Sequence, residues 1–148
     1  MKFKCTIDID QPRDLVTRYF ADPNYLHEYQ DGFVKKELLR GVEGENEAVS
    51  KIYYKQGGRD LLLKETIRAN QLPEKFEAFY EHVHMDNSMK CTFTQLSENQ
   101  TRYETEIHYV RMSWIMPRLM GILFPGMFRK QVEKWMHNFK IFVEKQEC

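Results

Sequence analysis

The sequence predicts an α+β fold in which a curved seven-stranded antiparallel sheet wraps around a long C-terminal helix, with two short helices after the first strand. Three observations predict it: an alternating strand at residues 2–9, a series of strands between residues 33 and 112, and an amphipathic helix at residues 128–145. The chain of 148 residues has the length of one domain, which we expect to span residues 1–148.

The N-terminal part begins with a strand. Residues 2–9 alternate between apolar and polar side chains, which is typical of a half-buried strand. Residues 10–30 then carry two short helical patterns. We expect Asp10 to cap the first helix, Asp22 to start the second, and Gly32 to end the pair.

Six further strands are predicted in the middle of the chain, because short strand-like runs are separated by turn-forming segments such as GVEGEN and QGGR. Their spacing is near the roughly 8–12 residues of an antiparallel meander. The predicted strands are residues 33–40, 47–55, 60–69, 75–85, 88–96 and 101–112.

The final helix is predicted from apolar side chains at helical spacing, with charged residues on the opposite face. It would have about five turns. A strongly curved antiparallel sheet can wrap around such a helix, and the two short helices then close one end of the gap. Its apolar face comprises Phe128, Val132, Trp135, Met136, Phe139, Phe142 and Val143.

The overall composition excludes several classes of protein. Lysine and arginine total 22, as do aspartate and glutamate, so the zero net charge gives no reason to expect nucleic acid as a partner. No stretch of about 18 apolar residues predicts a transmembrane segment, and the first residues lack the apolar region of a signal peptide. Cys5, Cys91 and Cys148 are odd in number and widely spaced, which argues against disulfides and zinc and predicts reduced thiols in a cytoplasmic protein.

Three segments carry a resemblance to a known superfamily: PRDLVTRYFADPNYLHEYQDG, LPEKFEAFYE and FRKQVEKWMHNFKIFVEK. With the opening strand, they resemble the START/Bet v 1-like superfamily (SRPBCC), and most closely its small bacterial proteins of the polyketide cyclase/dehydrase and lipid-transport type. The family often has a tryptophan near the end of the second short helix, where Tyr29 stands here. The resemblance implies the helix-grip fold, with a hydrophobic cavity between sheet and long helix.

Strand alternation predicts which side chains face that cavity. If the lysines and most glutamates of each strand point outward, the inner wall is apolar but carries a few polar groups, as small-molecule pockets usually do. A buried Glu65 needs a partner, for which Arg111 or a histidine is expected. The polar groups predicted on the wall are Tyr54, Glu65, Tyr80, His82, His84, Tyr109 and Arg111.

Glu65, His82 and His84 are the candidates for chemistry. They have the residue types of an acid–base group acting on an enolisable, polyketide-like substrate. The alternative is that they form a satisfied polar network without a catalytic role. A metal is not expected, because the histidine pair lacks a third ligand at a matching spacing. The sequence has no cofactor-binding motif, so no cofactor is expected.

The apolar segment SWIMPRLMGILFPGMFRK, residues 113–130, precedes the long helix. Three interpretations stay open: it fills the core where the long helix begins, it lines the cavity as a lid, or it forms a dimer or membrane-surface patch. The protein would be a monomer or a homodimer. The predicted cavity lining also includes Met116, Leu119, Met120, Phe124, Phe128 and Met136.

The preferred functional prediction is binding or carriage of a hydrophobic small molecule, lipid-, quinone- or polyketide-like, in this cavity. One alternative is a small cyclase or dehydratase that uses the same cavity. The other is a protein-interaction module. No strong catalytic constellation is evident, which favours the first prediction.

Overall fold

The structure is a computed structural model of the chain, and it describes residues 1–113 and 126–147. Within these residues seven strands form one antiparallel sheet in the order β1-β7-β6-β5-β4-β3-β2. The strands are β1 (Lys2–Ile9), β2 (Phe33–Arg40), β3 (Val49–Gln56), β4 (Arg59–Gln71), β5 (Lys75–Glu81), β6 (Met85–Ser97) and β7 (Gln100–Met112).

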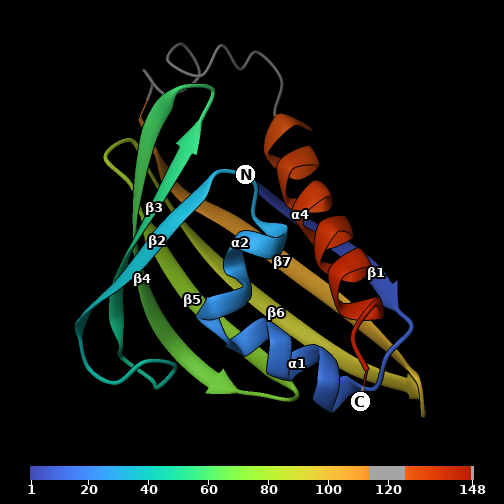
Figure 1. The fold of residues 1–148 in the computed structure, drawn as a ribbon. Coiled ribbons are helices and arrows are strands. Elements are labelled where there is room, and N and C mark those ends of the chain that lie inside the picture. The colour runs from blue at the N-terminus through green and yellow to red at the C-terminus, as the bar shows by residue number, and fades with distance from the viewer. Residues whose placement is uncertain (114–125, 148) are drawn as a thin grey trace.

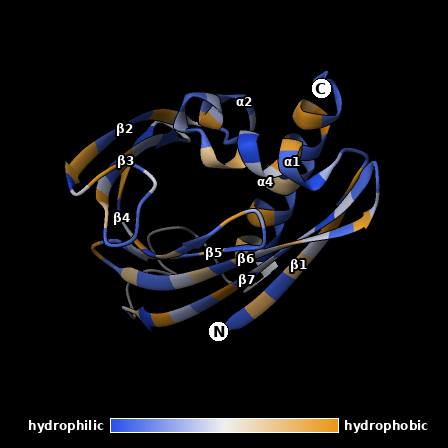
Figure 2. Cartoon of the chain, turned by 90° about the horizontal axis from the view of Figure 1, so that it is seen from below, coloured by the Kyte–Doolittle hydropathy of each residue, from blue (hydrophilic) through white to orange (hydrophobic). Residues whose placement is uncertain are grey.

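The helices lie on one side of the sheet. They are α1 (Arg13–Ala21), a 3-10 turn η1 (Pro23–Tyr25), α2 (Leu26–Tyr29) and the long α4 (Gly126–Glu144). The sheet curves around α4, and α1 and α2 lie between one end of the sheet and that helix (Figure 1). Seen from below, the sheet forms a trough whose open side the helices cover (Figure 2). This arrangement confirms the predicted fold class.

The core lies between α4 and the strands that face it. Phe139 of α4 is 1% exposed, and its ring lies 4.8 Å from the ring of Tyr29 and 5.8 Å from that of Tyr103. Met136 and Val143, one helical turn to either side, are also buried in this cluster. The predicted apolar face of the long helix is therefore the face that packs on the sheet.

The start of the first helix differs from the prediction. Helix α1 begins at Arg13 after Pro12, and no side chain caps it. Asp10 lies before this start, where its backbone N–H donates to the Glu144 carboxylate (2.7 Å). The predicted Asp10 cap is therefore wrong. Asp22 does accept from the Asn24 backbone N–H (2.9 Å) at the start of η1, as predicted.

Gly32 joins the short helices to the sheet. Its φ of +81° is a conformation that glycine adopts without strain. Its carbonyl accepts from the Lys55 N–H (2.7 Å), and a Cβ atom at this position would lie 2.3 Å from the Lys55 carbonyl oxygen. The glycine therefore allows the chain to run close against β3 as β2 begins.

No helix among the described residues is long and apolar enough to cross a membrane.

Candidate functional site

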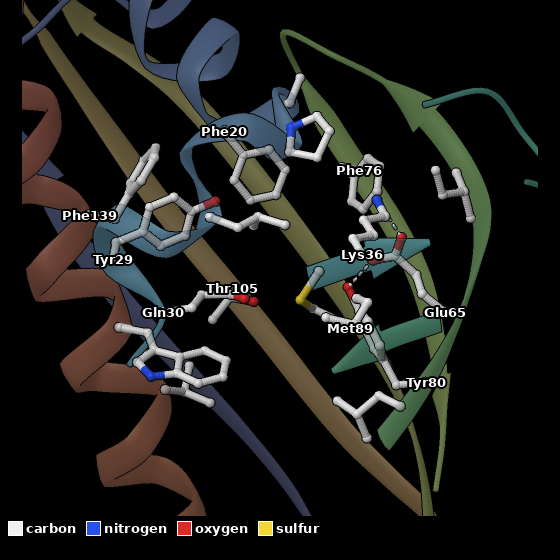
Figure 3. Close-up of a pocket in the computed structure, with 18 of the residues that line it drawn as sticks. Phe20, Tyr29, Gln30, Lys36, Glu65, Phe76, Tyr80, Met89, Thr105 and Phe139 are labelled. Carbon is white, nitrogen blue, oxygen red and sulfur yellow. Dashed lines mark hydrogen bonds and ion pairs between the residues drawn. The ribbon is translucent and has the colours of Figure 1, made fainter. Parts of the chain in front are cut away.

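A cavity of about 230 Å³ lies between the concave face of the sheet, α4 and the short helices. Most of its lining is apolar, and Phe20, Phe76, Met89 and Phe139 point into it (Figure 3). Its volume is somewhat below the roughly 300–1,000 Å³ found for ligand pockets, so it suits one compact organic molecule.

One part of the wall carries a polar cluster, which we define as Lys36, Glu43, Glu65 and Tyr80. Lys36 Nζ lies 3.1 Å from one carboxylate oxygen of Glu65 and 2.8 Å from Glu43 Oε1. The Tyr80 hydroxyl donates to the other Glu65 oxygen at 2.7 Å. Figure 3 shows Lys36 and Tyr80 meeting at the Glu65 carboxylate. The side chains of Lys36 and Glu65 are only 13% and 8% exposed, so their interaction is shielded from solvent.

The charges and burial within the cluster determine the protonation states of Lys36 and Tyr80. Burial by itself lowers the pKa of Lys36, but the Glu65 and Glu43 carboxylates outweigh burial and hold that pKa above its ordinary value. Burial, together with the charge of Glu65, raises the pKa of Tyr80 well above its ordinary value. At neutral pH Lys36 is therefore a cation and Tyr80 is a neutral hydrogen-bond donor.

A second polar group lies where α4 faces β3. The ring of Trp135 stacks on that of Tyr54, with the centroids 5.5 Å apart, and the Tyr54 hydroxyl donates to Gln30 Oε1 at 2.8 Å. All three side chains line the cavity. Trp135 Nε1 is buried and has no hydrogen-bond acceptor among the described residues. An indole N–H of this kind can donate to a ligand oxygen.

The structure brings together four of the predicted site residues: Tyr54, Glu65, Tyr80 and Met136 all line the cavity. The partner of Glu65 is Lys36, which strand alternation did not identify. Lys36 faces the cavity because the register between β2 and β3 shifts after Phe33, so that Lys36 pairs with the cavity-lining Ile52.

His82 and His84 are not among the described residues that line the cavity. Strand β5 ends at Glu81, and the histidines belong to the turn before β6, where the His82 backbone N–H donates to the Met85 carbonyl (2.8 Å). Their rings lie 5.8 Å apart, and His84 Nδ1 lies 3.3 Å from Ser113 Oγ. The two histidines are therefore not part of the described cavity lining, because strand alternation does not extend past Glu81, the last residue of β5.

Arg111 is also not on the cavity wall. The register between β6 and β7 shifts so that Tyr109 pairs with Asn87 but Arg111 pairs with Asp86, which turns Arg111 to the outer face. There its guanidinium contacts Asp86 at 2.8 Å and donates to the His82 carbonyl at 2.7 Å. The predicted pairing of Arg111 with Glu65 is therefore wrong.

Tyr109 and Phe128 contact each other beside the cavity. Their ring centroids are 4.9 Å apart, and Tyr109 also lies 6.3 Å from the ring of Phe3. Neither residue is among the described residues that line the cavity. The remaining predicted cavity residues lie outside the described part of the chain: Met116, Leu119, Met120 and Phe124.

No protein-family model and no curated protein sequence matches this chain. Solved structures do. The chain is similar to a START superfamily protein from Mycobacterium smegmatis over 97% of both chains, with a TM-score of 0.75 and 9% identity. It is similar to Ara h 8.0201 over 99% of both chains, with a TM-score of 0.74 and 9% identity. A third similar structure is the di-domain ARO/CYC StfQ from the steffimycin biosynthetic pathway, with a TM-score of 0.78 and 13% identity over 97% of this chain and 45% of that one.

These similarities confirm the expected architecture: the chain has the helix-grip fold of START and Bet v 1-like proteins. At such low identity they show the fold alone. The chemistry of the cavity therefore depends on its own residues.

Proposed function

We propose that this protein binds and carries a hydrophobic small molecule, of lipid-, quinone- or polyketide-like chemistry, in the cavity between the sheet and α4. The observation that carries the proposal is an apolar wall interrupted by a small polar cluster. Burying apolar ligand surface contributes roughly 25 cal/mol per Å² to the favourable free energy of binding. A few polar groups then set the orientation of the ligand.

The enzymatic alternative is less well supported. His82 and His84, the predicted acid–base pair, lie in the turn between β5 and β6 rather than among the described residues of the cavity wall. Glu65 is held by Lys36 and Tyr80, an arrangement typical of a satisfied polar network. The interaction-module alternative depends on the apolar segment before α4, most of which lies outside the described residues.

The proposal predicts saturable binding of a neutral environment-sensitive dye. We expect 6-propionyl-2-dimethylaminonaphthalene to bind one molecule per chain with a blue-shifted emission, because the cavity is apolar. Met89→Trp should weaken this binding by about tenfold or more, since the larger side chain fills the cavity. Fluorescence titration, with excitation where the protein does not absorb, measures both effects.

Leu96→Trp is the matched control, because Leu96 lies on the same strand, β6, but is 40% exposed. It should leave dye affinity unchanged while adding the same side chain. Equal affinity of the two variants would show that the dye binds elsewhere, and the proposed function would then be wrong. Thermal unfolding of both variants verifies that each is folded.

A further inference from the structure

We infer that the ligand presents a neutral hydrogen-bond donor, such as a phenolic or alcoholic hydroxyl, to Glu65, and that the site selects against carboxylate ligands. This inference rests on the proposed function and narrows it to a class of ligand. It follows from the sign of the charge on the wall and from the hydrogen-bonding capacity that the polar cluster retains.

The charged side chains on the described cavity wall are one cation and two anions: Lys36, Glu43 and Glu65. With all three ionised, the described part of the wall carries a formal charge of −1. Among its described side chains Lys36 is the one charge that would attract an anion, and it already contacts both carboxylates, at 2.8 and 3.1 Å. A ligand carboxylate would have to compete with two neighbouring carboxylates for this ammonium group.

Burying a further anion beside these carboxylates is unfavourable. A carboxylate that leaves water must recover its hydration energy from partners, and a like charge nearby raises the cost further. The Tyr80 hydroxyl does not help, because it already donates to Glu65 at 2.7 Å. The cavity therefore disfavours the head group of a fatty acid or other carboxylic acid in its ionised form.

Glu65 retains capacity to accept from a neutral donor. A carboxylate has about four lone-pair positions on its two oxygens. Among the described residues, Lys36 occupies one position and Tyr80 another. A ligand hydroxyl can therefore donate to Glu65 without displacing either partner, and a hydrogen bond to a buried carboxylate is stronger than one between neutral groups.

The indole N–H of Trp135 has no acceptor among the described residues, and this donor would suit an anion as well as a neutral oxygen. It lies on α4, whereas Glu65 lies on β4. One neutral N–H does not offset the desolvation of a carboxylate, but it does suit a carbonyl, ether or hydroxyl oxygen. Trp135 is thus compatible with a neutral, oxygen-bearing ligand.

Three probes of nearly equal shape test the inference: 2-naphthol, 2-methoxynaphthalene and 2-naphthoate. At pH 7 the first is a neutral donor, the second lacks the donor, and the third is an anion. Each is titrated against the protein loaded with the neutral dye described above, and displacement gives its affinity. We expect 2-naphthol to bind about tenfold or more tightly than either of the other two.

Two variants distinguish the effect of the polar cluster on ligand preference from the general preference of apolar cavities for neutral molecules. Glu65→Gln keeps the shape but removes the charge, and it should reduce the preference for 2-naphthol over 2-naphthoate severalfold. Glu37→Gln is the matched control, because Glu37 lies on β2 next to Lys36 in sequence but is exposed and pairs with Lys35. It should leave the preference unchanged.

The inference is supported if 2-naphthol binds tightly and its preference over 2-naphthoate falls with Glu65→Gln but persists with Glu37→Gln. Equal or tighter binding of 2-naphthoate, or a preference that Glu65→Gln leaves unaltered, overturns it while the proposed function stands, because the dye and the probes still bind. Failure of the dye itself to bind overturns the proposed function and this inference together.

Discussion

Lys36→Met is expected to lower the free energy of unfolding by about 3–5 kcal/mol, because it leaves the Glu65 carboxylate buried without its cation. The Glu65 side chain is 8% exposed, so bulk solvent screens the uncompensated charge poorly. Tyr80 remains as one hydrogen-bond donor to Glu65, but a neutral hydroxyl does not compensate a full charge. Urea unfolding of the variant and the parent protein measures the difference.

The double variant Lys36→Met/Glu65→Met tests whether this loss comes from the pair. Removing both charges should cost much less than the sum of the two single changes, because Glu65 is then no longer a buried charge without its cation, and Glu43, which also loses Lys36, is 38% exposed to solvent. Strictly additive losses would mean that Lys36 and Glu65 do not interact, which would contradict the ion pair in the polar cluster.

Phe139→Ala is expected to cost about 3–5 kcal/mol of unfolding free energy. The ring is 1% exposed and contacts those of Tyr29 and Tyr103, so its removal deletes buried contacts between α4 and the elements facing it. The same urea unfolding measurement applies.

Ile141→Ala on the same helix is the control for this prediction. Ile141 is 42% exposed, so its truncation should change the unfolding free energy by no more than about 0.5 kcal/mol. A loss below about 1 kcal/mol for Phe139→Ala, or equal losses for the two variants, would show that this face of α4 is not in the core.

The fold was predictable because its main signals are local and repeated. The apolar stripe of the final helix has the helical period, and alternation in β1 identifies Cys5 and Ile9, both now seen in the core. Alternation also identified Tyr54, Glu65 and Tyr80 as inward-facing, because β3, β4 and β5 pair without a register shift at these positions. Where strands are regular, the sequence pattern determines the face.

The remaining site residues were not predictable because irregularities in the sheet leave no clear mark in sequence. The register shift in β2 turns Lys36 inward, and the shift between β6 and β7 turns Arg111 outward. His82 and His84 follow the apparent alternation of β5 but lie past its last residue. A one-residue shift exchanges the two faces of a strand, so each irregularity reverses every assignment that follows it.

The central claim is that a hydrophobic ligand binds inside the curve of the sheet, and methyl NMR of the methionines tests it most directly. Met89 and Met136 line the cavity, whereas Met1 is 43% exposed. Single methionine-to-leucine substitutions assign the signals, and 2-naphthol is then added to saturation. We predict that the Met89 and Met136 methyl signals shift while that of Met1 stays in place. A shift of Met1 with unchanged Met89 and Met136 signals would place the ligand on the surface and contradict the claim.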